Sequence, residues 1–91
     1  MQSTLDTLTK LAAKIVRRAA EELPPERLLL EEGLLDSMQV IELADAIEDH
    51  FPILLDPMEL SPEHFSSLSS LLRLIERKLA PSVTVKARRA I

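Results

Sequence analysis

The segment Gly33-Leu34-Leu35-Asp36-Ser37-Met38 joins a leucine-rich stretch to the predicted start of a helix. Ser and Asp are common helix N-caps, because their side-chain oxygens accept hydrogen bonds from backbone N–H groups that the helix leaves free. Ser37 therefore has two interpretations. It is either a structural helix cap or an exposed hydroxyl to which another group is attached.

After this junction the sequence predicts a helix over residues 37–51. Its apolar residues recur at i, i+3, i+4, i+7 and i+11, the spacing of one buried helix face: Val40, Leu43, Ala44, Ile47 and Phe51. Pro52 follows and ends the pattern. Met38 and Ile41 lie off this face, close to the serine, and suggest a small apolar docking spot.

Three further helices are predicted. The first covers residues 4–21, begins with the capping-box pattern of Ser3 and Asp6, and stops before Pro24-Pro25. A short helix follows the Ser61 cap and has Pro62 in its first position. The last is capped by Ser66 or Ser67, is stopped by Pro81, and repeats the same apolar spacing at Leu68, Leu71, Leu72, Ile75 and Leu79.

Residues 24–36 show no convincing helix, yet they contain five leucines. We expect several of these leucines to hold a long loop against the other helices, and loops of this length in compact domains tend to be functional. Gly33 is the only glycine in the chain. We expect it to adopt a positive φ, which other residues reach only at a cost.

Composition supports an all-α fold. The chain has 91 residues, of which 46% are hydrophobic and only two are aromatic. We expect a four-helix bundle with three main helices, one short helix and a long first loop. Residues 1–80 would form a single domain, and residues 81–91, which carry three basic and no acidic side chains, a disordered tail.

The sequence contains no cysteine, which excludes disulfides and thiolate metal sites. No apolar run approaches the roughly 20 residues of a membrane span. The N-terminus lacks the basic and apolar regions of a signal peptide. We therefore expect a cytoplasmic, monomeric protein without membrane insertion.

The charge distribution is one-sided. Between Arg27 and Arg73 there are ten acidic residues and no Lys or Arg. Such a surface favours basic partners and repels nucleic acid. Four of these acids fall on the helix over 37–51 without the lysines that usually accompany them: Glu42, Asp45, Glu48 and Asp49. They are either ordinary solvated surface or a recognition face.

Side-chain catalysis finds no support in the sequence. The only histidines are His50 and His64, and Ser37 is separated from His50 by thirteen residues, roughly 20 Å along one helix. No segment has the spacing of an EF-hand or a zinc site. We therefore predict neither catalytic nor metal-binding residues, and no enzyme activity.

Asp36-Ser37-Met38, followed by Val40-Ile41-Glu42-Leu43 and ending at Phe51, resembles the attachment segment of acyl carrier proteins. The resemblance extends over about residues 4–80. It implies a discrete carrier whose Ser37 receives 4′-phosphopantetheine from coenzyme A through a phosphopantetheinyl transferase, with Asp36 assisting. The thiol of the arm would hold acyl groups as thioesters for fatty-acid, polyketide or related synthesis.

The resemblance also implies partner contacts. Acidic residues would meet basic patches on a loading ligase and on synthases or transferases, and two apolar residues would add contact area. The residues that match these positions are Met38, Ile41, Glu42, Asp45, Glu48 and Asp49.

Two departures leave the subclass open. Gly33 stands three residues before Asp36, whereas many fatty-acid carriers place their glycine two before, and the spelling is more like that of D-alanyl and some specialised stand-alone carriers. Asp45 occupies a position that is often apolar in fatty-acid carriers. An aminoacyl, D-alanyl or peptidyl carrier is thus an alternative, although the Gly-Gly-x-Ser of many peptidyl carriers is absent. There are two further alternatives for the function. One is an unmodified helical adaptor that binds a basic partner, and the more remote one is a calcium-responsive module.

Overall fold

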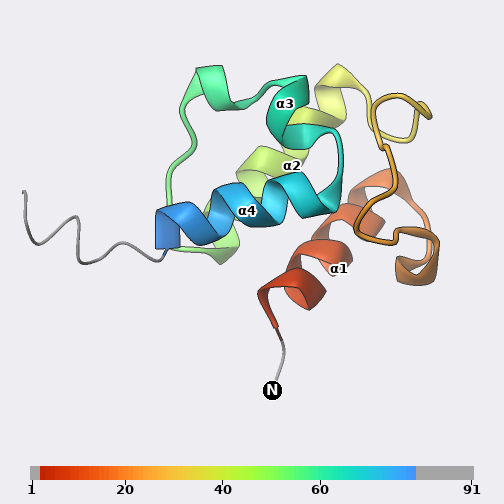
Figure 1. Ribbon diagram of the computed structural model, residues 1–91, viewed down its shortest axis with the longest axis horizontal. Coiled ribbons are helices and arrows are strands. Elements are labelled where there is room, and N and C mark those ends of the chain that lie inside the picture. Colours follow the sequence, from red (N-terminus) through yellow and green to blue (C-terminus); the bar gives the residue numbers. More distant parts are fainter. Residues whose placement is uncertain (1–2, 80–91) are drawn as a thin grey trace, which may run out of the picture.

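A computed structural model describes residues 3–79 and shows an all-helical fold (Figure 1). Four α-helices and two short 3₁₀ helices follow one another, and the described residues contain no strand. Their order is α1 (Thr4–Val16), η1 (Ala20–Glu22), α2 (Ser37–His50), η2 (Pro57–Glu59), α3 (Pro62–Phe65) and α4 (Leu68–Leu79). The expected bundle of three main helices and one short helix is confirmed. The expectations for the tail at 81–91 fall on residues outside this range.

The first helix, α1, begins as predicted but ends early. The Ser3 side chain accepts a hydrogen bond of 3.0 Å from the Asp6 N–H. The helix stops at Val16 rather than near residue 21, because Arg17 adopts a left-handed conformation with φ 60°. The N–H groups of Arg17 and Arg18 then both bond to the Ala13 carbonyl, the usual way of closing a helix C-terminus.

Within a helix over residues 4–21, Arg17 and Glu21 would have the i,i+4 spacing of an ion pair, but α1 ends before both of them. Arg18 instead lies 3.6 Å from Glu22, across the start of η1. Both side chains are about half exposed, so this pair contributes little to stability.

The long loop between η1 and α2 is attached to the junction of α3 and α4. The Leu29 N–H bonds to the Ser66 carbonyl at 2.7 Å, and the Ser69 N–H bonds to the Pro25 carbonyl at 2.9 Å. Buried leucines complete the attachment: Leu23, Leu29 and Leu35. The loop is therefore part of the fold, as its leucine content predicted.

Within this loop the chain turns back on itself before α2. The Leu29 carbonyl accepts the N–H groups of both Leu34 and Leu35. Gly33 has φ +75°, as expected for the only glycine. The Arg27 side chain joins the start of the loop to its middle. Its Nε lies 2.8 Å from Glu32 Oε1, and its Nη1 donates to the Glu22 carbonyl at 2.6 Å.

Helix α2 buries the predicted face. Its buried residues are Val40, Leu43, Ala44 and Ile47. Phe51 follows as the C-cap, is half-buried, and donates its N–H to the Ile47 carbonyl. Pro52 prevents continuation of the helix.

Helix α4 begins after Ser67, whose Oγ accepts the Ser70 N–H at 3.2 Å, so Ser67 and not Ser66 caps this helix. The predicted face is mostly correct. Leu68, Leu71 and Ile75 are buried, but Leu74 is buried as well, whereas Leu72 is half-buried.

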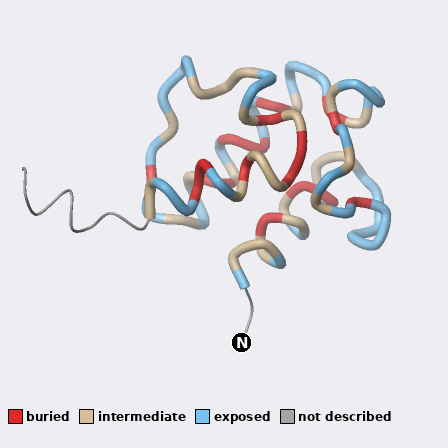
Figure 2. The backbone as a smooth tube through the Cα atoms, viewed as in Figure 1, coloured by how far each residue is buried: buried red, intermediate tan, exposed pale blue. Residues whose placement is uncertain are grey.

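One hydrophobic core holds the helices together. Figure 2 shows the buried segments of α1, α2 and α4 facing inward, with exposed residues concentrated in the loops. Helix α1 packs against both α2 and α4, and α3 packs against α4. The core includes Leu8 and Ala12 of α1 together with Phe65 of α3. None of the helices within residues 3–79 has the length and apolar composition needed to cross a bilayer.

Candidate functional site

The cap of α2 is Asp36, and Ser37 is the first helical residue. The Gln39 N–H donates to Asp36 Oδ1 at 2.8 Å, and the Asp36 N–H donates to Gln39 Oε1 at 3.0 Å. These two bonds form a complete capping box. The interpretation of Ser37 as the helix cap is therefore wrong, because the carboxylate before it already performs that task.

Ser37 is exposed and adjoins unsatisfied backbone donors. The first N–H groups of a helix have no partner within the helix. Here Gln39 N–H is used by the capping box and Val40 N–H by the Asp36 carbonyl. The N–H groups of Ser37 and Met38 make no hydrogen bond to any residue between 3 and 79. Two free N–H groups at a positive helix end suit the oxygens of a phosphate ester on Ser37.

An apolar depression lies beside Ser37, between the start of α2 and the start of α3. It has a volume of about 380 Å³ and is lined by Leu30, Ser37, Val40, Ile41, Leu60, Ser61 and Pro62. We did not predict this depression from the sequence. Its walls come from three segments far apart along the chain, so helix periodicity gives no signal for it. The Ser61-Pro62 start of the short helix is the only local signal there, and it marks a helix start rather than a cavity.

The two apolar residues predicted for docking are exposed next to Ser37. Met38 is 67% exposed and Ile41 is 51% exposed. Ile41 also lines the depression, so it contacts both the solvent and the space beside the serine.

The acidic residues of α2 do not have equivalent surroundings. Glu42, Asp45 and Asp49 are exposed. Glu48 is half-buried, and its Oε2 accepts the Leu55 N–H at 2.7 Å. This bond holds the segment after α2 against the helix. Glu48 therefore has a structural contact that sequence reasoning missed, since it joins a side chain to a backbone group seven residues away.

Neither histidine is placed to activate Ser37. His50 is the last residue of α2, at the opposite end from Ser37, and packs edge-on against Phe51 with ring centroids 5.9 Å apart. Within residues 3–79, no three His, Asp or Glu side chains are grouped as metal ligands.

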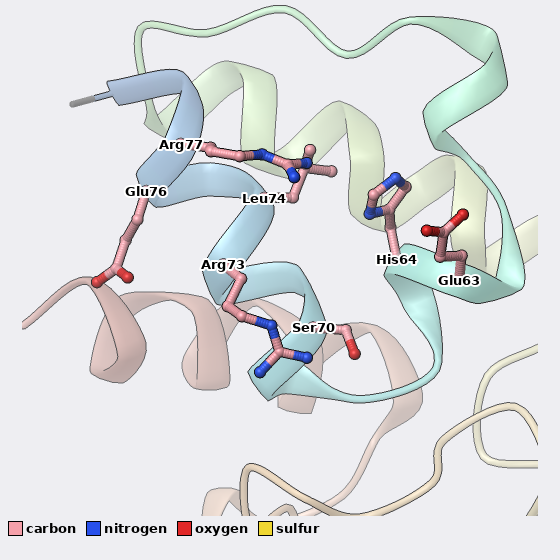
Figure 3. A pocket seen from close by; sticks show the side chains of 7 residues that line it. All are labelled: Glu63, His64, Ser70, Arg73, Leu74, Glu76 and Arg77. Atoms are coloured by element: carbon pink, nitrogen blue, oxygen red, sulfur yellow. The ribbon is translucent and has the colours of Figure 1, made fainter. Parts of the chain in front are cut away.

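A larger groove lies between α3 and α4 (Figure 3), and Ser37 is not among the residues that line it. Its volume is about 520 Å³, and its polar lining includes His64, Ser70, Arg73 and Arg77. The Ser70 hydroxyl is within hydrogen-bond distance of the hydroxyls of Ser66 and Ser67. Among the described residues it makes no hydrogen bond to His64, so the groove contains no paired nucleophile and base.

No curated protein matches this chain. The model of the family described as the phosphopantetheine attachment site matches residues 6–75. This range covers most of the chain and includes the capping box, Ser37 and the depression. Domains of this family are non-catalytic carriers that hold 4′-phosphopantetheine covalently. On this match, the chain belongs to the phosphopantetheine attachment site family.

Proposed function

We propose that this chain is an acyl carrier protein and that Ser37 is the residue to which 4′-phosphopantetheine is attached. One observation carries the proposal. The Ser37 hydroxyl is exposed at the start of α2, where two backbone N–H groups are free within the described chain and an apolar depression begins. The free N–H groups suit a phosphodiester, and the depression suits the apolar part of a carried group.

The attachment is a phosphoryl-group transfer. Ser37 Oγ attacks the phosphorus that bears the pantetheine part of coenzyme A, and the new O–P bond replaces the pyrophosphate bond. Adenosine 3′,5′-bisphosphate leaves, and the hydroxyl proton passes to a base of the transferase. In this chain Asp36 is the assisting residue. Only its Oδ1 accepts a hydrogen bond from the described residues, so Oδ2 is available to the transferase or its metal ion.

Partner enzymes would approach over the start and the exposed acidic side of α2. Met38 and Ile41 supply apolar contact, and the exposed carboxylates of Glu42, Asp45 and Asp49 attract basic patches. We assign Glu48 a secondary part in this contact, because its carboxylate is already bonded to Leu55. Charge-driven association of this kind is fast and salt-sensitive. The partners are a phosphopantetheinyl transferase, a loading ligase, and the enzymes that use the carried group.

The attachment residue is tested by incubating the protein with coenzyme A and a promiscuous phosphopantetheinyl transferase. We expect the mass of one phosphopantetheine to be added to the wild type and to Ser69→Ala, a control that removes a hydroxyl from α4. Ser37→Ala should stay unmodified. Modification of Ser37→Ala at the wild-type rate would refute the assignment. An unmodified wild type would favour the helical adaptor instead.

The acyl cargo is tested separately, because the glycine position resembles that of D-alanyl carriers. Transferase loading from octanoyl-, acetyl- and alanyl-coenzyme A gives three forms of the protein. If the depression holds an alkyl chain, the octanoyl form has the highest melting temperature, and amide signals of Val40, Ile41 and Leu60 shift most in that form. Equal melting temperatures and unshifted signals would favour an aminoacyl carrier.

A matched pair of substitutions identifies the location of the cargo. Leu60→Asn places an amide in the wall of the depression, whereas Leu54→Asn makes the same exchange at a leucine that is 78% exposed. The octanoyl effect should be lost in Leu60→Asn and retained in Leu54→Asn.

A further inference from the structure

The side chain of Gln39 connects the Asp36–Ser37 junction to α1. Its Oε1 accepts the Asp36 N–H at 3.0 Å, and its Nε2 donates to the Ile15 carbonyl over 3.4 Å. Its backbone N–H donates to Asp36 Oδ1. The residue therefore contacts the segment that precedes the serine and the last turn of a different helix at the same time.

The Ile15 carbonyl is a suitable acceptor because α1 leaves it without a helical partner. The last four carbonyls of a helix accept no hydrogen bond from an N–H group of the same helix. Since α1 ends at Val16, these are the carbonyls of residues 13–16. The Ala13 carbonyl accepts from Arg17 and Arg18, and the side chain of Gln39 reaches the Ile15 carbonyl from α2.

Only an amide of this length meets both requirements. It offers a carbonyl oxygen to the Asp36 N–H and an N–H to the Ile15 carbonyl. A glutamate would keep the first bond and lose the second. A methionine would have a similar length and lose both.

We propose that Gln39 is a positioning residue for the modification of Ser37. By joining the Asp36 N–H to the end of α1, it fixes the direction in which the Asp36 carboxylate and the Ser37 hydroxyl leave the bundle. This inference rests on the proposed function, since it concerns the transfer reaction at Ser37. Gln39 acts through its neighbours and need not touch coenzyme A.

The proposal predicts an effect on the turnover number rather than on binding. Partner contacts of the exposed side of α2 are unaffected by loss of the Gln39 amide, so the KM for the carrier protein should stay nearly constant. A displaced hydroxyl reduces the fraction of encounters with correct geometry, and a displacement approaching 1 Å can cost on the order of a hundredfold in rate. For a partial displacement, we expect kcat to fall about tenfold in Gln39→Met and less in Gln39→Glu.

The experiment measures transferase kinetics and urea unfolding on the same full-length variants: wild type, Gln39→Glu, Gln39→Met and Ser67→Ala. Ser67→Ala removes the cap of α4 and so weakens the fold away from Ser37. Its kcat should equal that of the wild type in spite of lower stability. Gln39→Met also separates loss of the bonds from the added charge of Gln39→Glu.

A second readout observes the bond directly. The chain has only two glutamines, Gln2 and Gln39, so their side-chain amide signals are easily assigned by NMR. The Gln39 Nε2 protons should exchange with water more slowly than those of a free glutamine amide. Loss of the bond should also shift the amide signals of residues 15–18 in Gln39→Glu.

The outcomes separate this inference from the function on which it rests. If the wild type is not modified, the proposed function fails, and the inference fails with it. If the wild type is modified and the Gln39 variants keep its kcat, only the positioning role is overturned. The same holds if their kcat falls only as much as that of Ser67→Ala, or if the loss appears in KM alone.

Discussion

The ammonium group of Lys78 lies 2.9 Å from Oε1 of Glu59 and joins the end of α4 to the segment between α2 and α3. The same carboxylate oxygen accepts the Asp56 N–H at 2.9 Å. Both charged side chains are about three-quarters buried. Leu60, the next residue, forms part of the depression beside Ser37. The pair thus stabilises a segment that shapes the candidate site.

This pair makes stability depend on pH. Burial alone would raise the pKa of Glu59, but the Asp56 N–H and the Lys78 ammonium group, with a smaller contribution from His64, together lower the pKa below its ordinary value of 4.5. Because the folded pKa is the lower one, the stabilisation is complete above about pH 4.5 and is lost as the pH falls through the folded value. Glu59→Gln should therefore be less stable than the wild type at pH 7, by about 0.5–1 kcal/mol. Urea unfolding from pH 7 to pH 3 should show the difference shrinking.

The control for this prediction is Glu63→Gln, which removes an exposed carboxylate on α3. This carboxylate forms no ion pair within residues 3–79, so Glu63→Gln should be less destabilising than Glu59→Gln at pH 7. A constant deficit of Glu59→Gln over the whole pH range would contradict the role of the charged pair.

Asp36 and Ser37 should respond differently to substitution. Asp36→Ala removes the cap of α2 and should lower the free energy of unfolding by about 1 kcal/mol. Ser37→Ala should change it by less than about 0.5 kcal/mol, because the exposed hydroxyl is not the cap. Asp36→Asn keeps the cap without the charge, so it should unfold like the wild type but be modified more slowly. Equal destabilisation by the two alanine substitutions would restore Ser37 as a cap.

The acidic side of α2 should separate into structural and recognition residues. Glu48→Ala loses the acceptor of the Leu55 N–H and should cost about 1 kcal/mol in unfolding free energy, whereas Asp49→Ala, at an exposed neighbour, should cost little. Denaturant titration of both variants checks this. An equal effect of both would show that the Glu48 bond contributes nothing.

Glu42→Lys combined with Asp45→Lys should slow modification at low salt while leaving unfolding nearly unchanged, and the difference should diminish as salt is added. Transferase kinetics at two salt concentrations measure this. Glu21→Lys combined with Glu76→Lys reverses the same number of charges at exposed positions outside α2 and serves as the control. Kinetics as slow in this control as in the α2 variant would show that only net charge matters.

Substitution of the two described residues with positive φ, Arg17 and Gly33, should change the free energy of unfolding in opposite directions. Arg17→Gly relieves a left-handed conformation and should raise the free energy of unfolding by about 0.5 kcal/mol, after the entropy cost of glycine. Gly33→Ala should lower it by about 1 kcal/mol. Apart from Gly33 and its two chain neighbours, no residue has a heavy atom within 4 Å of the position where the Cβ would be, so this cost comes from the local backbone conformation. Thermal and urea unfolding of the two variants measure both effects.

Helix periodicity made most of this fold predictable. The faces of α2 and α4 follow the 3.6-residue repeat, because these helices bury one stripe against a single core. The end of α1 was not predictable in this way. The apolar spacing continues to Ala19, and nothing in the sequence marks Arg17 as the residue that turns left-handed.

At the candidate site, the start of a helix at the Asp36–Ser37 junction was predicted. Which of the two residues caps this helix was not. Asp36 and Ser37 are both good caps, and capping preference alone does not decide between them. Gln39, three residues after Asp36, was the available signal, since a capping box pairs a cap with Glu or Gln at that distance. The depression and the Glu48 bond depend on contacts between distant or irregular segments. Periodicity carries no information about such contacts.

The bonds of Arg27 to Glu32 and to the Glu22 carbonyl have a practical consequence for proteolysis. Trypsin must draw an arginine side chain into its own pocket, and here that side chain is already held by the loop. Cleavage after Arg27 therefore requires the segment leading to Ser37 to open locally. The rate of that single cut, followed by mass spectrometry under native conditions, should measure how often the approach to the serine leaves its folded conformation.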